Sequence, residues 1–132
     1  MIRFQDLKEG DIVMAEYDGQ LREGVVTDLN REDKEVCVET DVQEFWFSPE
    51  QLHPIPLDEQ QLFKLGFVRE ELENGIVKYL KDSFRIKVPD NGKFYPLEIW
   101  WREDHRLLAQ PLAVHELQNH YYQMTKVELN PA

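Results

Sequence analysis

The sequence is poor in cysteine and glycine. Its one cysteine, Cys37, lies in the alternating stretch KEVCVET, so the chain has neither an internal disulfide nor a cluster of thiolate metal ligands. Gly66, Gly75 and Gly92 stand alone in the sequence, and no glycine-rich loop is present to hold a phosphate group. We expect Cys37 to be a half-buried residue of a strand.

Long apolar segments are also missing. No stretch reaches the roughly 18 consecutive apolar residues that a membrane helix needs. The start, MIRFQDLKEGD, lacks the basic and then apolar segments of a signal peptide. We therefore expect a cytoplasmic protein with no membrane partner. With 132 residues, 42% of them hydrophobic, the chain is long enough for one domain or two very small ones.

Positive charge is scarce, and the excess of acid lies in the first half. Of the formal net charge of -11, residues 1–56 account for -9, with 5 Lys and Arg against 14 Asp and Glu. Residues 57–132 hold 10 basic against 12 acidic side chains and carry -2. Because an acidic surface repels a polyanion, this balance argues against a general DNA-binding or RNA-binding protein.

The first half has the pattern of short strands joined by turns. Apolar and polar residues alternate between positions 12 and 47, and Asp18-Gly19 separates two such stretches, which predicts a tight hairpin. Strands this short do not bury their faces in a flat sheet, so we expect a small barrel. The stretch SPEQLHPIP predicts one short helical turn and an exit restrained by Pro54 and Pro56.

The second half predicts a compact unit of helix, antiparallel strands and helix. Asp58 as N-cap, Gln61 at the third helical position and Gly66 as C-cap bound a short first helix. Strands are predicted in GIVKYLKD, in SFRIKVPDNGKFYPLEIWW with a second hairpin turn at Asn91-Gly92, and in HRLLAQPL. The apolar spacing of a final amphipathic helix is carried by Val114, Leu117, Tyr121 and Met124.

The predicted fold class is therefore mainly β with α+β. We expect a barrel over residues 1–53, a Pro-rich seam over 54–57 and an α+β unit over 58–132.

Both halves also resemble known groups of proteins. The stretches DLKEGDIV, LREGVVTDL and VQEFWFSPEQLHPI, with the spacing of Leu7, Gly10-Asp11 and Val13, resemble an SH3-like barrel of the Tudor or KOW type. The remainder, from PIPLDEQQLFKLGF to VHELQNHYYQMTKVEL, is similar to uncharacterised small proteins of Bacteroides-type bacteria and their phages or mobile elements. The second resemblance implies no activity and no functional residues.

The nearest approach to a metal motif is HELQNH. A zinc protease motif needs two histidines four residues apart, but His120 follows His115 by five, about 140° further round a helix. Asn119 occupies the position that would fit. We therefore predict no metal and no cofactor. Neither His53 nor His105 has a Ser, Cys or second His close in sequence, so no catalytic residue is predicted.

Aromatic residues are the better candidates for a binding site. SH3-like barrels often use exposed rings to hold peptides, methylated cations or bases, and the resemblance extends this expectation to Tyr17 and Trp46. Phe45 and Phe47 share one face of a strand, and we expect both in the core. Adjacent Trp100 and Trp101 point to opposite faces, so one of them either packs between the halves or is exposed to a partner. The candidate binding residues are Tyr17, Trp46, Trp100 and Trp101.

Three functions follow from these patterns. The leading hypothesis is a non-catalytic protein-protein interaction module, related to phages or mobile elements, whose partner is a basic protein. The alternative is nucleic-acid association through basic residues of the second half, although alternating solvent-facing residues of an antiparallel sheet are the better explanation of these residues. A small enzyme is the third. The basic residues in question are Lys78, Lys81, Arg85, Lys87, Lys93, Arg102 and Arg106.

Overall fold

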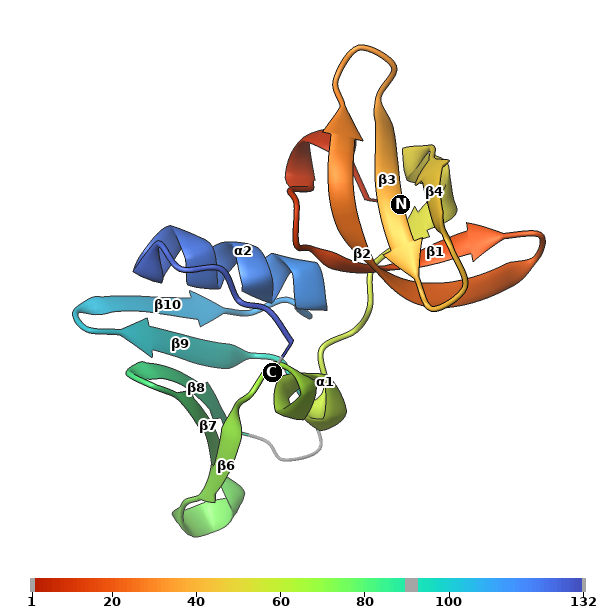
Figure 1. Ribbon diagram of the computed structural model, residues 1–132. Helices are drawn as coiled ribbons and strands as arrows, with labels where there is room; N and C mark the ends of the chain where they lie inside the picture. Colours follow the sequence, from red (N-terminus) through yellow and green to blue (C-terminus); the bar gives the residue numbers. More distant parts are fainter. Residues whose placement is uncertain (1, 90–92, 132) are drawn as a thin grey trace. The chain divides into compact units, whose positions relative to one another are not determined.

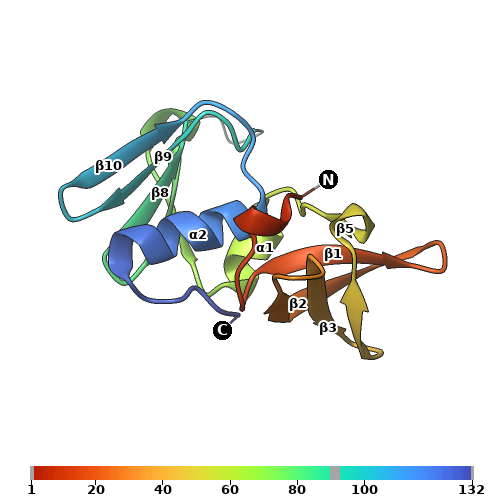
Figure 2. The ribbon, with the colours of Figure 1, turned by 90° about the horizontal axis from the view of Figure 1, so that it is seen from above.

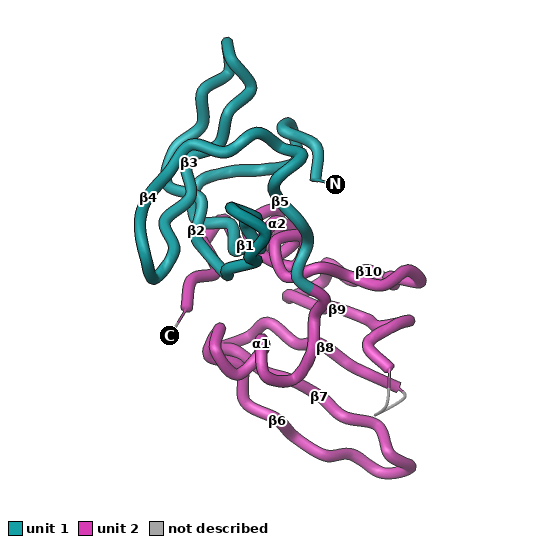
Figure 3. Tube along the Cα trace, turned by 90° about the vertical axis from the view of Figure 1, so that its right-hand side faces the viewer, with its two compact units in different colours: residues 1–55 teal, residues 56–132 magenta. Residues whose placement is uncertain are grey.

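The computed structural model describes residues 2–89 and 93–131. Within this part, the protein contains two antiparallel sheets of five strands each and two α-helices (Figure 1). This confirms the prediction of a mainly β chain with α+β character. The chain divides into two compact units, Met1–Ile55 and Pro56–Ala132, called unit 1 and unit 2 below (Figure 3).

Unit 1 contains one antiparallel sheet with the strand order β4-β3-β2-β1-β5. The sheet is not closed, since β4 and β5 are its two edges. Short 3-10 helices at Phe4–Asp6 and Pro49–Gln51 flank it, and the second is the predicted single turn. The two-residue strand β5 was not predicted. The strands are β1 (Ile12–Tyr17), β2 (Gln20–Asn30), β3 (Glu35–Thr40), β4 (Glu44–Phe47) and β5 (Leu52–His53).

The hairpin predicted at Asp18-Gly19 joins β1 to β2. Tyr17 pairs with Gln20 across it, and both turn residues have positive φ, 53° at Asp18 and 75° at Gly19. Two consecutive left-handed residues are the geometry of a type I′ turn, whose twist matches that of the strands it joins. The turn therefore fixes which side chains of β1 and β2 share a face.

One hydrophobic core fills the concave face of this sheet. Cross-strand pairing places Val26 opposite Val38 and Val36 opposite Phe47, so apolar residues of three strands meet there. Gly24 lets β3 approach β2, because a Cβ at this position would lie 2.6 Å from Val38 Cγ1. The buried members of the core are Ile2, Leu7, Val13, Ala15, Val26, Val36, Val38, Phe47 and Leu52.

Unit 2 is an antiparallel meander with the strand order β10-β9-β8-β7-β6, preceded by α1 and followed by α2. The strand β6 was not predicted, and the predicted turn at Asn91-Gly92 lies outside the described residues. The elements are α1 (Glu59–Lys64), β6 (Val68–Glu71), β7 (Val77–Lys81), β8 (Phe84–Val88), β9 (Leu97–Trp101), β10 (Asp104–Leu108) and α2 (Val114–Thr125).

Both helices of unit 2 contribute to one face of its sheet. Phe84 on β8 meets Tyr121 of α2 with ring centroids 4.7 Å apart, and Tyr79 on β7 meets Phe63 of α1 at 6.4 Å. In Figure 2, α2 lies along the strands β8 to β10. All four residues of the predicted apolar stripe of α2, Val114, Leu117, Tyr121 and Met124, are buried. This face, called the inner face of unit 2, therefore holds the core.

Helix caps follow the local sequence closely. The carboxylate of Asp58 accepts a hydrogen bond from the N–H of Gln61 at 2.9 Å, which confirms Asp58 as N-cap of α1. The C-cap is Leu65 and not Gly66 as predicted. Gly66 follows it at φ 91°, in the left-handed region that glycine adopts without steric cost.

Candidate functional site

The rings of Tyr17 and Phe45 form an exposed contact in unit 1. Tyr17 ends β1 just before the hairpin turn and is 54% exposed, while Phe45 on β4 is 37% exposed. Their centroids lie 5.3 Å apart. Phe45 in turn meets the buried Phe47 at 6.3 Å. Aromatic rings of two strands distant in sequence thus form one row that runs from the surface into the core.

A hollow of about 190 Å³ lies beside this row, between the β1–β2 and β3–β4 hairpins. Its inner part is apolar, with Ala15 and Phe47, and its rim carries the polar side chains of Asp18, Gln20 and Gln43. We call the hollow together with Tyr17 and Phe45 the aromatic hollow.

Arg22, a cation that lines the hollow, already has partners. Arg22 lies 3.5 Å from the carboxylate of Asp41 and donates a hydrogen bond of 3.0 Å to the side-chain oxygen of Gln20. Its positive charge is thus partly balanced within unit 1. Asp18 adds a carboxylate to the same rim.

Trp46 lies on the other face of β4. It is 47% exposed and pairs across the strands with Cys37, whereas Phe45 and Phe47 pair with Val38 and Val36 of the core. Cys37 is buried, and not half-buried as predicted. The candidate residues Tyr17 and Trp46 therefore do not share a site.

The sequence prediction was wrong about Phe45. Phe45 shares a strand face with the buried Phe47, and this suggested a position in the core. However, Phe45 is two residues nearer the β3–β4 turn, at the edge of the core. There its ring contacts the ring of Tyr17. The missed signal is this closeness to the turn, since the inward residue next to a turn lies at the rim of a small sheet rather than at its centre.

Trp100 of unit 2 is held between two other side chains. On the face opposite to the inner face, the register aligns Arg85, Trp100 and His105 across β8, β9 and β10. The rings of Trp100 and His105 are stacked at 4.6 Å with 5° between their planes, and the Arg85 guanidinium lies 5.8 Å from the Trp100 centroid. Because its neighbours stand on opposite sides, Trp100 does not offer a free ring face.

Trp101 points to the inner face and is half-buried, like Trp100. The guanidinium of Arg102 lies 4.3 Å from the centroid of its ring. The prediction that these two adjacent rings point to opposite faces therefore matches the register, and each ring has an arginine side chain packed near it.

The basic residues of unit 2 are divided between the two faces. Lys78, Arg85 and Lys87 share the outer face, which is the face opposite to the inner one. There Lys78 lies directly opposite Lys87, and this pair is flanked by Glu70 on β6 and by Glu98 on β9.

Lys81 lies instead on the inner face, where its ammonium donates to the carbonyl of Leu65. Arg102 belongs to the turn between β9 and β10, and Lys93 lies outside the strands. The predicted nucleic-acid face is thus only partly assembled.

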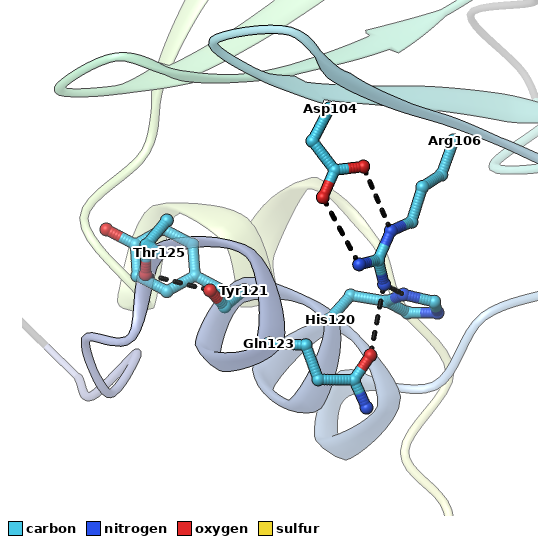
Figure 4. Close-up of polar contacts among 6 residues, drawn as sticks. All are labelled: Asp104, Arg106, His120, Tyr121, Gln123 and Thr125. Atoms are coloured by element: carbon cyan, nitrogen blue, oxygen red, sulfur yellow. Dashed lines mark hydrogen bonds and ion pairs between the residues drawn. The ribbon is translucent and has the colours of Figure 1, made fainter.

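Arg106 joins β10 to α2, as Figure 4 shows. Its Nη1 donates to His120 Nδ1 at 2.9 Å and to Gln123 Oε1 at 3.0 Å, and Asp104 holds the same guanidinium at 3.3 Å. Burial and the positive charge of Arg106 lower the pKa of His120 below its ordinary 6.5. His120 is therefore a neutral acceptor in a structural clamp.

His115 is buried elsewhere on the same helix. Within residues 2–89 and 93–131, no group of three or more His, Cys, Asp or Glu side chains has the arrangement of a metal site.

Across the part of the chain described here, no helix is both long and apolar enough to pass through a membrane. Comparisons of the chain with protein-family models, with curated proteins and with solved structures give no match.

Proposed function

We propose that the protein is a non-catalytic protein-protein interaction module, and that unit 1 binds a basic segment of a protein partner at the aromatic hollow. The observation that carries this proposal is the exposed contact of Tyr17 with Phe45 beside a hollow in a markedly acidic unit. Residues 1–56 hold 14 acidic side chains against 5 basic ones. Opposite charge favours encounter with a basic partner.

We further propose that unit 1 is an SH3-like barrel of the Tudor or KOW type. The pairing of β5 with β1 supports this, because it brings the last strand beside the first around one core. The 11-residue β2 pairs with both β1 and β3, and its register shifts between Val26 and Asp28. A bulge of this kind bends a strand and increases the curvature of the sheet.

The chemistry of the hollow fits a segment that carries both apolar and basic side chains. The rings of Tyr17 and Phe45 would contact the apolar side chains of this segment. The carboxylate of Asp18 at the rim would attract its positive charge. A cytoplasmic partner, and a link to phages or mobile elements of Bacteroides-type bacteria, are part of this proposal.

The test measures the affinity of the whole protein for a fluorescein-labelled octapeptide of alternating lysine and valine. We expect the wild type to bind it, and Tyr17→Ala and Phe45→Ala to weaken binding about fivefold or more, by loss of the ring faces. Leu107→Ala removes a side chain of unit 2 that is 66% exposed and serves as the control. Equal affinity of all variants, or preference for an octapeptide of alternating glutamate and valine, would contradict the proposal.

A second candidate function is weak binding of single-stranded nucleic acid on the outer face of unit 2. It is favoured by the common placement of Lys78, Arg85 and Lys87, and opposed by Glu70 and Glu98 on the same face. Binding of a labelled oligothymidine that Lys78→Ala with Lys87→Ala abolishes, and that falls steeply with salt, would support this function.

A further inference from the structure

The strand β4 is an open edge of the unit 1 sheet. It is the terminal strand of that sheet, and its first three residues, Glu44, Phe45 and Trp46, are all exposed. Natural sheets usually protect an edge with lysine, proline or a bulge, because unpaired main-chain groups attract another strand. The strand Glu44–Phe47 contains neither lysine nor proline, and its pairing with β3 is regular.

The register shows which main-chain groups face this edge. The N–H of Thr40 donates to the carbonyl of Gln43 at 2.9 Å, so these two residues form the hydrogen-bonded pair that closes the β3–β4 hairpin. Hydrogen-bonded and non-hydrogen-bonded pairs alternate along an antiparallel ladder. The N–H and C=O groups of Phe45 and Phe47 therefore point to β3, and those of Glu44 and Trp46 point away from it.

The side chains beside the edge are suited to a basic ligand. Glu44 lies directly opposite Glu39 in a non-hydrogen-bonded pair, where side chains are closest and like charges destabilise the sheet. Trp46 extends from the same face of the strand. On the other face, Phe45 and Tyr17 present an apolar surface. A basic side chain would relieve the repulsion of the two carboxylates and stack on Trp46.

We propose that the partner segment binds as an additional strand along β4. The proposal rests on the proposed function and specifies its ligand: an extended segment in which basic and apolar residues alternate. The basic side chains lie on the face of Glu44 and Trp46, and the apolar ones contact Phe45 and Tyr17. A second copy of this chain is a poorer occupant, because two units that each carry a charge of -9 over residues 1–56 repel one another.

Main-chain pairing is tested by N-methylation of the same lysine-valine octapeptide. One peptide carries N-methyl groups on its lysines and another on its valines, and both keep every side chain and charge. Since alternate residues of an added strand bond to β4, one methylated peptide should bind about tenfold or more weakly than the parent, while the other keeps its affinity. Weaker binding of the peptide with methylated lysines indicates an antiparallel added strand. Weaker binding of the peptide with methylated valines indicates a parallel one.

Amide hydrogen exchange of the same complex gives a second, independent measurement. We expect the main-chain amides of Glu44 and Trp46 to exchange at least tenfold more slowly when the parent peptide is bound. Equal effects of the two methylated peptides, together with unchanged exchange at these amides, would overturn strand addition. If Tyr17→Ala still weakens binding in that case, the aromatic hollow remains the binding site. If the parent peptide does not bind at all, the proposed function fails together with this inference.

Discussion

At the scale of single residues, the exposure of Tyr17 follows from its place in the chain. It is the last residue of β1, and the left-handed pair Asp18-Gly19 turns the chain away directly after it. The ring therefore extends beyond the rows of side chains that fill the core. The contact between Tyr17 and Phe45 restricts both rings in the unbound protein. This lowers the side-chain entropy that is lost on binding.

Tyr79 stabilises unit 2 through its hydroxyl group. The ring is 1% exposed, and the hydroxyl donates to the Glu59 carboxylate at 2.8 Å. Burial and the hydrogen bond to Glu59 raise the pKa of Tyr79 to about 12. We expect Tyr79→Phe to lower the free energy of unfolding by about 1 kcal/mol in urea denaturation. Tyr95→Phe, at a ring that is 44% exposed, is the control, and an equal loss for both variants would contradict this role.

His120 should make the stability of the protein depend on pH. Its pKa is lowered in the folded state, chiefly by burial and then by Arg106, against the effects of Glu116 and Asp104. As the pH falls through the ordinary value of 6.5, the unfolded chain takes up a proton that the folded chain resists, so stability is lost.

Thermal melting between pH 7.5 and pH 5.5 checks this expectation. The melting temperature of the wild type should fall further over this range than that of His120→Gln, which keeps an acceptor for Arg106 but does not titrate. The other histidines contribute to both proteins, so their effects cancel in the comparison. An identical fall in both would show that His120 is not the cause.

At the scale of elements, the close approach of β3 to β2 depends on Gly24. A Cβ at this residue would meet Val38 Cγ1 at 2.6 Å and the carbonyl oxygen of Glu39 at 2.8 Å. We expect Gly24→Ala to cost about 2 kcal/mol of stability, because β3 must move away from β2. Leu21→Ala changes a residue of the same strand that is 58% exposed, and it should cost less than about 0.5 kcal/mol. Chemical denaturation of both variants tests why glycine is needed at position 24: because β3 lies close to β2, or because of strand propensity.

Elements with strong local signals were predictable from sequence. The left-handed turn at Asp18-Gly19, the capping carboxylate of Asp58 and the apolar stripe of α2 each arise within a few residues. The strands β5 and β6 were missed for a physical reason. Leu52–His53 is too short for a periodic pattern, and Val68–Glu71 has one apolar residue in four. Such strands form because a neighbouring strand supplies their hydrogen bonds.

The candidate site was predictable only in part. Tyr17 was a candidate because of the resemblance to SH3-like barrels, and its ring is exposed as that expectation requires. Phe45 was missed, since its exposure depends on how far the core extends beneath β4 and on the approach of Tyr17 from another strand. The contacts of Trp100 with Arg85 and His105 were likewise not predictable. They depend on the register of three strands, which no local sequence pattern specifies.

At the scale of the whole molecule, uneven charge should govern binding. Residues 1–56 carry -9 and residues 57–132 carry -2. If attraction between unit 1 and a basic segment contributes to affinity, the dissociation constant of the lysine-valine octapeptide should rise roughly tenfold between 50 and 500 mM NaCl. An octapeptide of alternating serine and valine is the control, and equal salt dependence of both peptides would exclude this electrostatic contribution.

The most direct test of the central claim is an NMR titration of the isotope-labelled protein with the lysine-valine octapeptide. We expect the amide signals with the largest shifts to belong to Tyr17, Asp18, Glu44, Phe45 and Trp46, and the indole signal of Trp46 to move with them. Signals of the unit 2 sheet, including those of Lys78, Arg85 and Lys87, should stay in place. Shifts confined to these unit 2 residues, or no shifts at all, would contradict the assignment of binding to the aromatic hollow and the edge of β4.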